Sequence, residues 1–569
     1  MNPKILSIDH LDIRFPSREG PFYAIKDVSF DVHYGQSIGI VGESGSGKSI
    51  TALSMLNLLP PNAVSQGTVN YRIKADHWVN MLRAGPKTIR NIRGKHMAMI
   101  FQEPMTSLNP VYTCGNQVAE IMIRHLSVSH RQAREKAIDL FGEVELPQPG
   151  RIYRSYPHEL SGGQRQRVMI AMAIACDPKL LIADEPTTAL DVTIQQSILT
   201  LLKGLKQRYG MSLIFISHDL AVVSKIADEI VVMHKGLIAE KGKKQQIIHS
   251  PKNNYTQGLI ACKPPLDRKP KRLFTMDDFL GSTREKVKGE PEQHIKTVTS
   301  VQEPQKDRSV LFHLEGVDKS FPLSKDFFGR NRESLPAIQQ VSLSIFQGET
   351  LGLVGESGSG KSTLARILLK LLSFDRGDIF YKGKDLRALG KQDLRFFRQK
   401  AQIIFQDPYA TLNPRLSAGK MISEPLKYYG YEKNPKSRRE HCLKLLDDVR
   451  LDETYYNRYP HELSGGQRQR VAIARVLALN PEFIVCDEAV SALDVSIQAE
   501  ILNLLQDLKA RYDLTLVFIT HDFSVVRFMS ERVAIMREGS VEEIGETADI
   551  FDAPEKAYTK KLLQAIPVI

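Results

Sequence analysis

The sequence predicts an α/β fold that occurs twice along the chain, and three observations support this prediction. A glycine-rich phosphate-binding motif, GESGSGKS at residues 42–49, returns unchanged at 355–362. Each copy follows a short apolar run and precedes a segment of helical pattern, which is the strand–loop–helix context that this motif requires. A later motif also recurs, since Ser161 and Ser464 lie 303 residues apart in nearly identical surroundings. The chain is therefore predicted to contain two copies of one phosphate-binding domain.

The domain boundaries follow from this repeat and from local composition. Residues 1–262 and 310–569 are assigned to the two domains, and residues 263–309 to a linker. The linker is rich in proline and mixed charge, which indicates a flexible segment, although part of it could also pack as an arm. The first domain has nine extra residues before Gln102, and the polar stretch at 73–93 is predicted to be a surface insertion.

Composition bounds the class of protein. Of the 569 residues, 42% are hydrophobic and 25% are charged, as in ordinary globular proteins. The sequence has no apolar run long enough to span a bilayer and no apolar core of a secretory signal near its first residue, so a soluble cytoplasmic protein is expected. The net charge of +12 allows a nucleic-acid or anionic membrane partner. Because this charge is spread along the chain, we favour a phosphate-binding protein with a basic surface.

The two glycine-rich loops are predicted to bind phosphate groups. Glycines let main-chain N–H groups surround the phosphates, and the N-terminus of the following helix favours negative charge. The lysine of each loop would reach the outer phosphates, and Ser49 and Ser362 would hold Mg²⁺. The predicted phosphate-binding residues are Gly42, Ser44, Gly45, Gly47 and Lys48 in the first copy and Gly355, Ser357, Gly358, Gly360 and Lys361 in the second.

Two apolar runs end in acidic pairs, Asp184-Glu185 and Asp487-Glu488. A buried strand that ends this way presents both carboxylates at the edge of an α/β sheet where ligands bind. The first acid of each pair suits the metal shell, and the second suits a general base that polarises an attacking water. Such a pair is more often structural when it stands alone, but its place downstream of a phosphate loop favours the catalytic interpretation.

His218 and His521 each follow an apolar run, 33 residues after Glu185 and Glu488 respectively. A single histidine at the end of a strand is usually a polar cap. The equal spacing in both halves supports a second interpretation, in which each histidine is a donor that senses the γ-phosphate.

Two glutamines and two phenylalanines complete the candidate set. Gln102 and Gln406 follow apolar runs and would be ordinary loop residues if taken alone. Phe15 and Phe321 precede the strand of each phosphate loop, and could either stack on a base or belong to the core.

Taken in order, these motifs resemble the ABC ATPase family over both halves. The signature LSGGQ of that family stands unchanged at 160–164 and 463–467, and Asp191 and Asp494 match its D-loop aspartate. The resemblance implies two tandem P-loop NTPase domains. Each would have a RecA-like core, an antiparallel β subdomain and a helical subdomain that carries LSGGQ.

The resemblance also implies how the two domains act together. They would form an internal pseudo-dimer, head to tail, with ATP and Mg²⁺ between the phosphate loop of one domain and the signature of the other. The catalytic residues would be Glu185, Glu488, His218 and His521, and the metal shell Ser49, Gln102, Asp184, Ser362, Gln406 and Asp487. The signature donors would be Ser161, Gly162 and Gly163 for the second site, and Ser464, Gly465 and Gly466 for the first. Both sites are expected to be competent, because neither departs from the family pattern.

Finer features resemble the oligopeptide, dipeptide and nickel importer group. Both signatures follow Tyr-Pro-His-Glu, and each domain ends in a Pro…Tyr-Thr segment, at 251–256 and 554–559. The fused pair is similar to the Yej-type subunit of peptide and microcin C importers. This likeness implies two integral-membrane permeases that contact the regions 102–110 and 406–414, an extracytoplasmic solute-binding protein, and a peripheral location at the cytoplasmic face of the inner membrane.

Two other functions are compatible with the sequence. A soluble tandem ABC ATPase could act on ribosomes or nucleic acid, and the positive charge allows this. The proline-interrupted linker and the importer-like motifs favour the transporter instead. No direct nucleic-acid partner is therefore expected. A scaffold that holds ATP without hydrolysing it is disfavoured by the intact Glu185 and Glu488.

Overall fold

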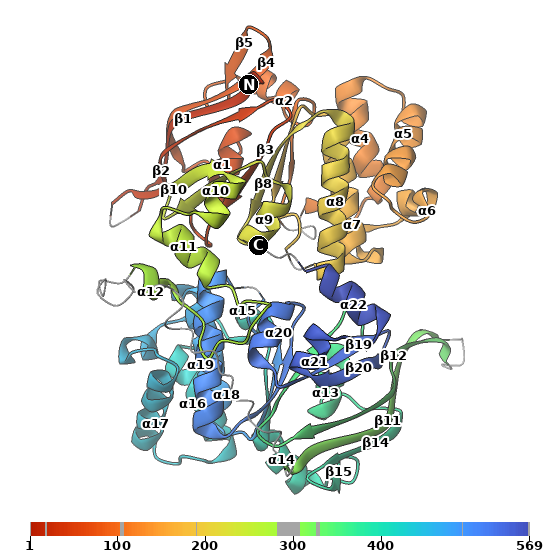
Figure 1. Ribbon diagram of the computed structural model, residues 1–569, viewed down its shortest axis with the longest axis vertical. Coiled ribbons are helices and arrows are strands. Elements are labelled where there is room, and N and C mark those ends of the chain that lie inside the picture. The colour runs from red at the N-terminus through yellow and green to blue at the C-terminus, as the bar shows by residue number, and fades with distance from the viewer. Residues whose placement is uncertain are drawn as a thin grey trace.

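The computed structural model describes residues 2–17, 20–102, 107–188, 190–280, 308–325, 331–491 and 493–566. Within these ranges the chain forms two halves of the same architecture, one above the other in Figure 1. Each half holds a six-stranded sheet, a four-stranded antiparallel sheet and a group of helices. The prediction of a duplicated α/β fold is therefore confirmed.

The six-stranded sheet carries the phosphate loop of each half. Its order is β10-β9-β3-β8-β7-β6 in the first half and β20-β19-β13-β18-β17-β16 in the second. Its strands pair in parallel except at β9–β10 and β19–β20, and the central strands are buried along their whole length, as in sheets covered on both faces. The strands are β3 (Ser37–Val41), β6 (Met97–Ile100), β7 (Leu180–Asp184), β8 (Ser212–Ser217), β9 (Glu229–His234), β10 (Leu237–Lys243), β13 (Thr350–Val354), β16 (Ala401–Ile404), β17 (Phe483–Asp487), β18 (Thr515–Ile519), β19 (Arg532–Arg537) and β20 (Ser540–Glu546).

The four-stranded sheets run β2-β1-β4-β5 and β12-β11-β14-β15. Their inner faces pack on the six-stranded sheets, so that each half has a continuous apolar core between the two sheets. The strands are β1 (Lys4–Phe15), β2 (Phe22–His33), β4 (Val64–Lys74), β5 (His77–Asn80), β11 (Val310–Lys325), β12 (Asn331–Phe346), β14 (Arg376–Tyr381) and β15 (Lys384–Asp385).

Helices cover the six-stranded sheets and frame the phosphate loops. Long helices α8 and α19 begin after the D-loop aspartates and end at left-handed residues, which terminate them. The helices are α1 (Lys48–Met55), α2 (Pro86–Ile92), α8 (Val192–Tyr209), α9 (Leu220–Ile226), α10 (Lys244–His249), α11 (Asn254–Ala261), α12 (Met276–Leu280), α13 (Lys361–Leu368), α14 (Lys391–Lys400), α19 (Val495–Tyr512), α20 (Phe523–Met529), α21 (Thr547–Asp552) and α22 (Ala557–Gln564).

A separate group of helices in each half carries the signature motif. Capping boxes start three of the α-helices. Ser129, Ser161 and Ser464 each accept a hydrogen bond from the main-chain N–H three residues on, and the glutamine there bonds back to the serine main chain. These elements are α4 (Cys114–Leu126), α5 (His130–Glu143), α6 (Pro149–Arg154), η1 (Pro157–Glu159), α7 (Gly162–Ile174), α15 (Pro408–Thr411), α16 (Ala418–Tyr429), α17 (Pro435–Asp448), η2 (Glu453–Asn457), η3 (Pro460–Glu462) and α18 (Gly465–Leu477).

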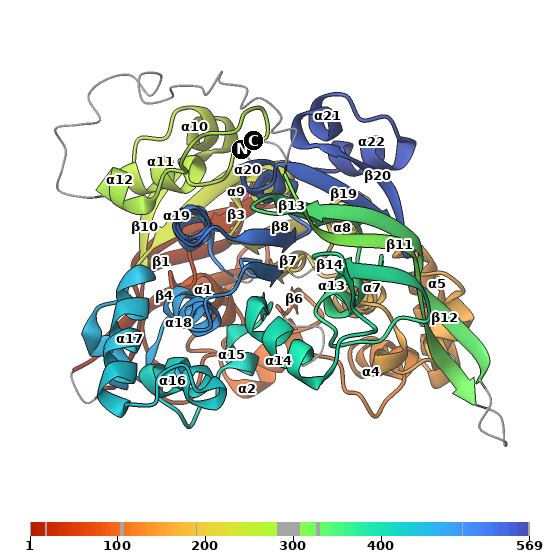
Figure 2. The same cartoon turned by 90° about the horizontal axis from the view of Figure 1, so that it is seen from below.

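The two halves face one another in opposite directions. In Figure 1 the helical group of the upper half, with α4 and α5, lies on the right, above the strands β11, β12 and β14 of the lower half. The helical group of the lower half lies on the left, below the strands of the upper half. Figure 2 shows the same exchange from below, with α16 and α17 on one side and α4 and α5 on the other. This is the head-to-tail arrangement that the resemblance implies.

The polar stretch at 73–93 lies at the surface, as predicted. It contains the exposed hairpin between β4 and β5 and the helix α2, of which only Ile89 and Ile92 are buried. The hairpin is longer than its counterpart, since β4 and β5 have 11 and 4 residues whereas β14 and β15 have 6 and 2.

The segment after α11 is packed rather than free, which differs from the expectation of a flexible linker. Residues 263–280 cross to the second half, where the amide and carbonyl of Leu273 bond to the side chain of Asn503, both at 2.9 Å. Leu273 is buried in the core of the second half, and α12 returns to pack on α11. The arm that the sequence left open is therefore present over 263–280, while residues 281–307 lie outside the described part.

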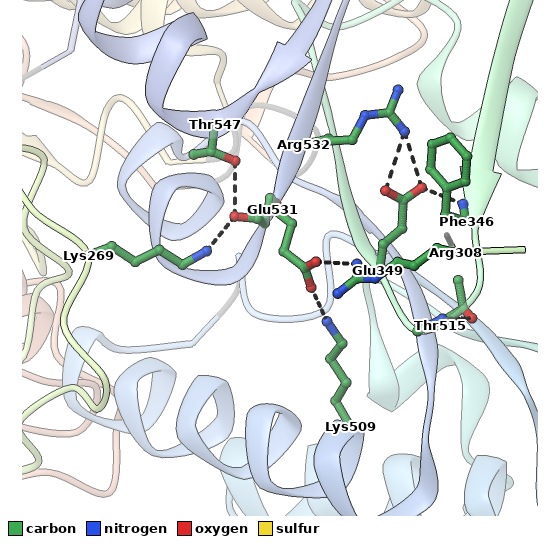
Figure 3. Close-up of polar contacts among 11 residues, drawn as sticks. Lys269, Arg308, Phe346, Glu349, Lys509, Thr515, Glu531, Arg532 and Thr547 are labelled. Carbon is green, nitrogen blue, oxygen red and sulfur yellow. Dashed lines mark hydrogen bonds and ion pairs between the residues drawn. The ribbon is translucent and has the colours of Figure 1, made fainter. Parts of the chain in front are cut away.

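Both parts of this connection contact the second half just before β19, at Ser530 and Glu531. Figure 3 shows Arg308 and Lys509 directed at the carboxylate of Glu531, which precedes β19. Lys269, from the arm, donates to the carbonyl of Ser530 beside it. These contacts lie at the N-terminal edge of the parallel strands, opposite the edge that carries the phosphate loops.

Among the described residues, no helix combines the length and the hydropathy needed to cross a membrane.

Candidate functional site

Each phosphate loop joins a buried strand to a helix. Helices α1 and α13 begin directly after Gly47 and Gly360, whose φ of 101° is left-handed and favours glycine. Lys48 Nζ donates to the carbonyl oxygens of Gly42 and Glu43, both at 2.8 Å. Lys361 makes the equivalent bonds in the second half. Each loop thus holds an ammonium group beside a helix N-terminus, an arrangement that attracts phosphate.

The acidic pairs come to the same sheet edge as the loops. Ser49 Oγ donates to Asp184 Oδ1 at 3.3 Å, and Ser362 Oγ to Asp487 Oδ1 at 3.1 Å. Burial raises the pKa of Asp184 to about 6, and also raises that of Asp487. A hydroxyl and a carboxylate held together supply hard oxygen ligands, the type that Mg²⁺ prefers.

The predicted base of the first half is surrounded by donors. Gln102 Nε2 donates to Glu185 Oε2 at 3.0 Å, Thr188 Oγ1 donates to the same oxygen at 2.8 Å, and His218 Nδ1 lies 3.4 Å from it. Burial alone would raise the pKa of Glu185, but the hydrogen bond and charge of His218 outweigh it and lower the pKa to about 2. Burial would also lower the pKa of His218, which Glu185 instead raises. The pair is therefore ionic.

The second half repeats this cluster with small changes. Gln406 Nε2 donates to Glu488 Oε2 at 2.6 Å, and His521 Nδ1 lies 3.6 Å from Glu488 Oε1. The hydrogen bond from His521 lowers the pKa of Glu488. Ser491, at the position of the threonine in the first half, donates to the main-chain carbonyl of Glu488 at 2.9 Å.

Both glutamates adopt a strained main-chain conformation. The φ angles of Glu185 and Glu488 are 46° and 49°, in the left-handed region that non-glycine residues rarely occupy. Their amides donate to the ends of β8 and β18, at Ile216 and Ile519, which fixes this conformation. Strain of this kind is concentrated at functional sites, and here it directs the carboxylate toward the glutamine and histidine.

Residues of one half reach the phosphate loop of the other. The amide of Ser44 donates to Asp494 Oδ1 at 2.7 Å, and Ser496 Oγ bonds to Glu43. Reciprocally, the amide of Ser357 bonds to Asp191. The two D-loop aspartates that the sequence identified therefore link the halves, and each phosphate loop is completed by the opposite half.

The signature motifs start helices next to these cross-contacts. The hydroxyl of Ser464 caps α18, and a Cβ on Gly466 would lie 2.5 Å from Cγ2 of Ile497 in the first turn of α19. Glycine therefore permits α18 to approach α19, and places the second signature close to Ser496, which touches the first phosphate loop. Ser161, Gly162 and Gly163 are placed in the same way at the start of α7.

The two phenylalanines are not placed alike. Phe15 is half-buried and packs against the core between the two sheets of the first half. Phe321 is 39% exposed, with Lys319 Nζ 5.8 Å from its ring centroid. The core alternative therefore fits Phe15 better, whereas Phe321 offers an accessible ring to a base.

Some contacts of the site were not predicted from the sequence. Tyr255, from α11, accepts a hydrogen bond from the amide of Glu43 at 3.1 Å and stacks on His234 with ring centroids 4.0 Å apart. The hydroxyl of Thr188 on Glu185 was also missed. The internal repeat could have pointed to both residues, since the second half has a tyrosine at the equivalent position 558 and a hydroxyl residue at the equivalent position 491.

Family models and known proteins match both halves of the chain. A family model described as ABC transporter matches residues 25–188 and 338–491, and one described as oligopeptide/dipeptide transporter, C-terminal region, matches 239–289 and 542–569. The glutathione import ATP-binding proteins GsiA of Shigella flexneri and Escherichia coli K12 are each 43% identical over 566 residues, or 99% of this chain and 90% of theirs. A solved dimer of the ATP-binding cassette MJ0796, in a post-hydrolysis state bound to ADP and Pi, is 32% identical, covers 42% of this chain and 98% of that one, and has a TM-score of 0.38.

The matched regions contain both phosphate loops and both acidic pairs described above. The family model alone covers more than half of the chain, and the curated relatives extend over nearly all of it. The chain therefore belongs to the ABC transporter family, as an ATP-binding protein that carries two ATPase domains.

Proposed function

We propose that the chain is the ATP-hydrolysing subunit of an importer of short peptides. The observation that carries the proposal is the presence of two complete sets of catalytic groups, each finished by a residue from the opposite half. The relatives named for glutathione import support a peptide solute, because glutathione is a tripeptide. The two matches to the oligopeptide/dipeptide transporter region support the same class.

Each site contains groups suited to hydrolysis. In the first site Glu185 would polarise the attacking water, His218 and Gln102 would orient it and the γ-phosphate, and Lys48 would bind the phosphates. The signature donors Ser464–Gly466 would approach from the other half. The second site would use Glu488, His521, Gln406, Lys361 and the donors Ser161–Gly163.

Mg²⁺ fits the residues present at each phosphate loop. Ser49, Asp184 and the side-chain oxygen of Gln102 would hold it together with the phosphate oxygens of ATP. Their counterparts in the second half are Ser362, Asp487 and Gln406. In the described part of the chain no group of three or more histidine, cysteine or acidic side chains could bind a metal by itself. Such a partial shell suits an ion that arrives with the nucleotide, and the bound ion would neutralise phosphate charge.

The surfaces next to the two glutamines suit membrane partners. Each half has a groove between its six-stranded sheet and its helical group, and exposed Phe101 and Phe405 lie beside them. Both grooves are lined mainly by apolar residues, but among its described lining residues the first has Arg93 as its single charged or amide side chain, whereas the second has both Gln402 and Arg475. We infer that two different permease subunits dock at these grooves and hold the chain at the cytoplasmic face of the membrane. The permeases would receive the solute from an extracytoplasmic binding protein.

Purification of the tagged chain from gently solubilised membranes of its host tests this proposal. Two polytopic membrane proteins in comparable amounts should co-purify, and the complex in liposomes should take up glutathione or dipeptides only with ATP. The E185Q/E488Q double variant is the matched control, since it should assemble without uptake. Co-purification of ribosomal proteins or nucleic acid without a permease would overturn the importer and favour the soluble tandem ATPase.

A further inference from the structure

One lysine of the arm lies between the His-Asp pairs of the two sites. Lys263 Nζ contacts Asp219 Oδ2 at 2.7 Å. Asp219 directly follows His218, and its other carboxylate oxygen accepts from the amide of Ala221 at 2.8 Å to start α9. Lys263 and both His-Asp pairs line one cavity between the halves. The lysine thus lies in a cavity that the histidine loops of both sites line, and it contacts the loop of the first site.

The repeat shows that this contact is asymmetric. Helices α11 and α22 are equivalent, and the position two residues after each helix holds Lys263 in the first half and Ile566 in the second. Ile566 lines the same cavity. Among the described residues that line it, Lys263 is the single lysine or arginine, although the cavity holds two aspartates.

The second aspartate is held by different means. Asp522 Oδ1 accepts from the amide of Ser524 at 2.8 Å and from its hydroxyl at 2.6 Å. The residue equivalent to Ser524 is Ala221, which has no hydroxyl to offer. The first half therefore uses the ammonium group of Lys263 where the second uses a local serine.

The charges around Lys263 keep the contact ionic. Burial would lower the pKa of Lys263, but Asp219 and Asp522 raise it. Burial would likewise raise the pKa of Asp219, and Lys263 outweighs this and lowers it. Removing the ammonium group would leave a partly buried carboxylate without its ion pair next to His218, which favours rearrangement of this loop.

We propose that Lys263 is a positioning residue that fixes the histidine loop of the first ATP site through its ion pair with Asp219. The proposal rests on the function proposed above for His218 and Glu185. It makes the first site dependent on the segment that joins the halves. The second site has no such dependence, because Ile566 cannot form an ion pair.

Steady-state ATP hydrolysis by the purified full chain tests the positioning role. K263M should lower kcat about three- to tenfold with KM for ATP within about twofold, because the groups that bind phosphate are untouched. K263R should retain most of the activity, since it keeps the charge. K271M is the matched control, because Lys271 is an exposed lysine of the same arm. Wild-type kcat in K263M, or equal losses in K263M and K263R with unchanged melting temperatures, would overturn the proposal.

Trapping of hydrolysed nucleotide tests the asymmetry. A photoreactive ATP analogue is trapped with vanadate, crosslinked, and located in the first or second half by peptide mass spectrometry. K263M should reduce the label in the first half relative to the second, whereas an equal reduction in both halves would contradict the proposal. The E185Q variant distinguishes a failure of the proposed ATPase site from a failure of the role proposed for Lys263. If E185Q hydrolysed ATP normally, the roles proposed for Glu185 and His218 would be refuted, whatever the result for Lys263.

Discussion

The two ATP sites contain the same motifs but differ in the residues that hold them. The side chain of Glu185 is 11% exposed and that of Glu488 is 22% exposed. Each accepts a bond from its glutamine, but Thr188 also donates to the carboxylate of Glu185, whereas Ser491 donates to the main-chain carbonyl of Glu488. The aspartate after the histidine pairs with Lys263 in the first half and with Ser524 in the second. Duplication has therefore preserved the groups proposed to act on ATP, while their neighbours have diverged. The two ATP sites can therefore differ in their surroundings although each keeps its full set of catalytic groups.

Single replacement of each base should produce the largest effect. E185Q and E488Q remove the carboxylate that would polarise water, which is worth roughly 100-fold or more in turnover. Both variants should still bind ATP, since the phosphate loops are intact. Measurements of ATP turnover and of equilibrium ATP binding on both variants check this. If one variant loses much more turnover than the other, the site that carries its replacement limits the cycle. Activity close to that of the wild type in either variant would refute the assignment of that base.

The arm offers the second test, at a position where the halves differ. N503A removes both hydrogen bonds to the buried main chain of Leu273, and should destabilise the protein by about 2 kcal/mol. The equivalent residue of the first half is Thr200, which is exposed and bonds within its own helix. T200A should therefore change stability by less than about 0.5 kcal/mol. Urea unfolding of both variants measures the difference, and equal losses would mean that the arm does not stabilise the second half.

Much of this organisation could be predicted because it is encoded locally. Apolar runs that end in Asp-Glu or precede histidine become buried parallel strands, and parallel strands end at one sheet edge, so Glu185 and His218 had to lie close to each other. The environment of Lys263 could not be predicted, because it depends on how the two halves face one another. The burial of Leu273 was missed for the same reason, since its partner Asn503 is 230 residues away. Prolines around it indicated flexibility, and tertiary contacts overrode that local signal.

The hydroxyl beside each base gives a finer comparison. T188V removes the bond to the carboxylate of Glu185 and should lower turnover several-fold while leaving ATP binding intact. S491A removes a bond to the main-chain carbonyl of Glu488, and its effect on turnover should be smaller. T188S is the matched control, because it keeps the hydroxyl. Equal losses in T188V and S491A would show that the two bases are held alike despite their different contacts.

The smallest expected effect is a dependence of stability on pH. Since Glu185 raises the pKa of His218 in the folded state, the protonated pair stabilises the protein fully below the unfolded histidine pKa of about 6.5, and this stabilisation disappears as pH rises through the raised folded pKa. Glu185 stays ionised over this window, because its pKa is lowered to about 2. The melting temperature of wild type should thus exceed that of H218Q by a few degrees at pH 6 and by less at pH 9. H521Q should show a smaller difference, because His521 lies 3.6 Å from its glutamate and His218 lies 3.4 Å from Glu185. A difference independent of pH would mean that packing of the ring, and not its charge, stabilises this loop.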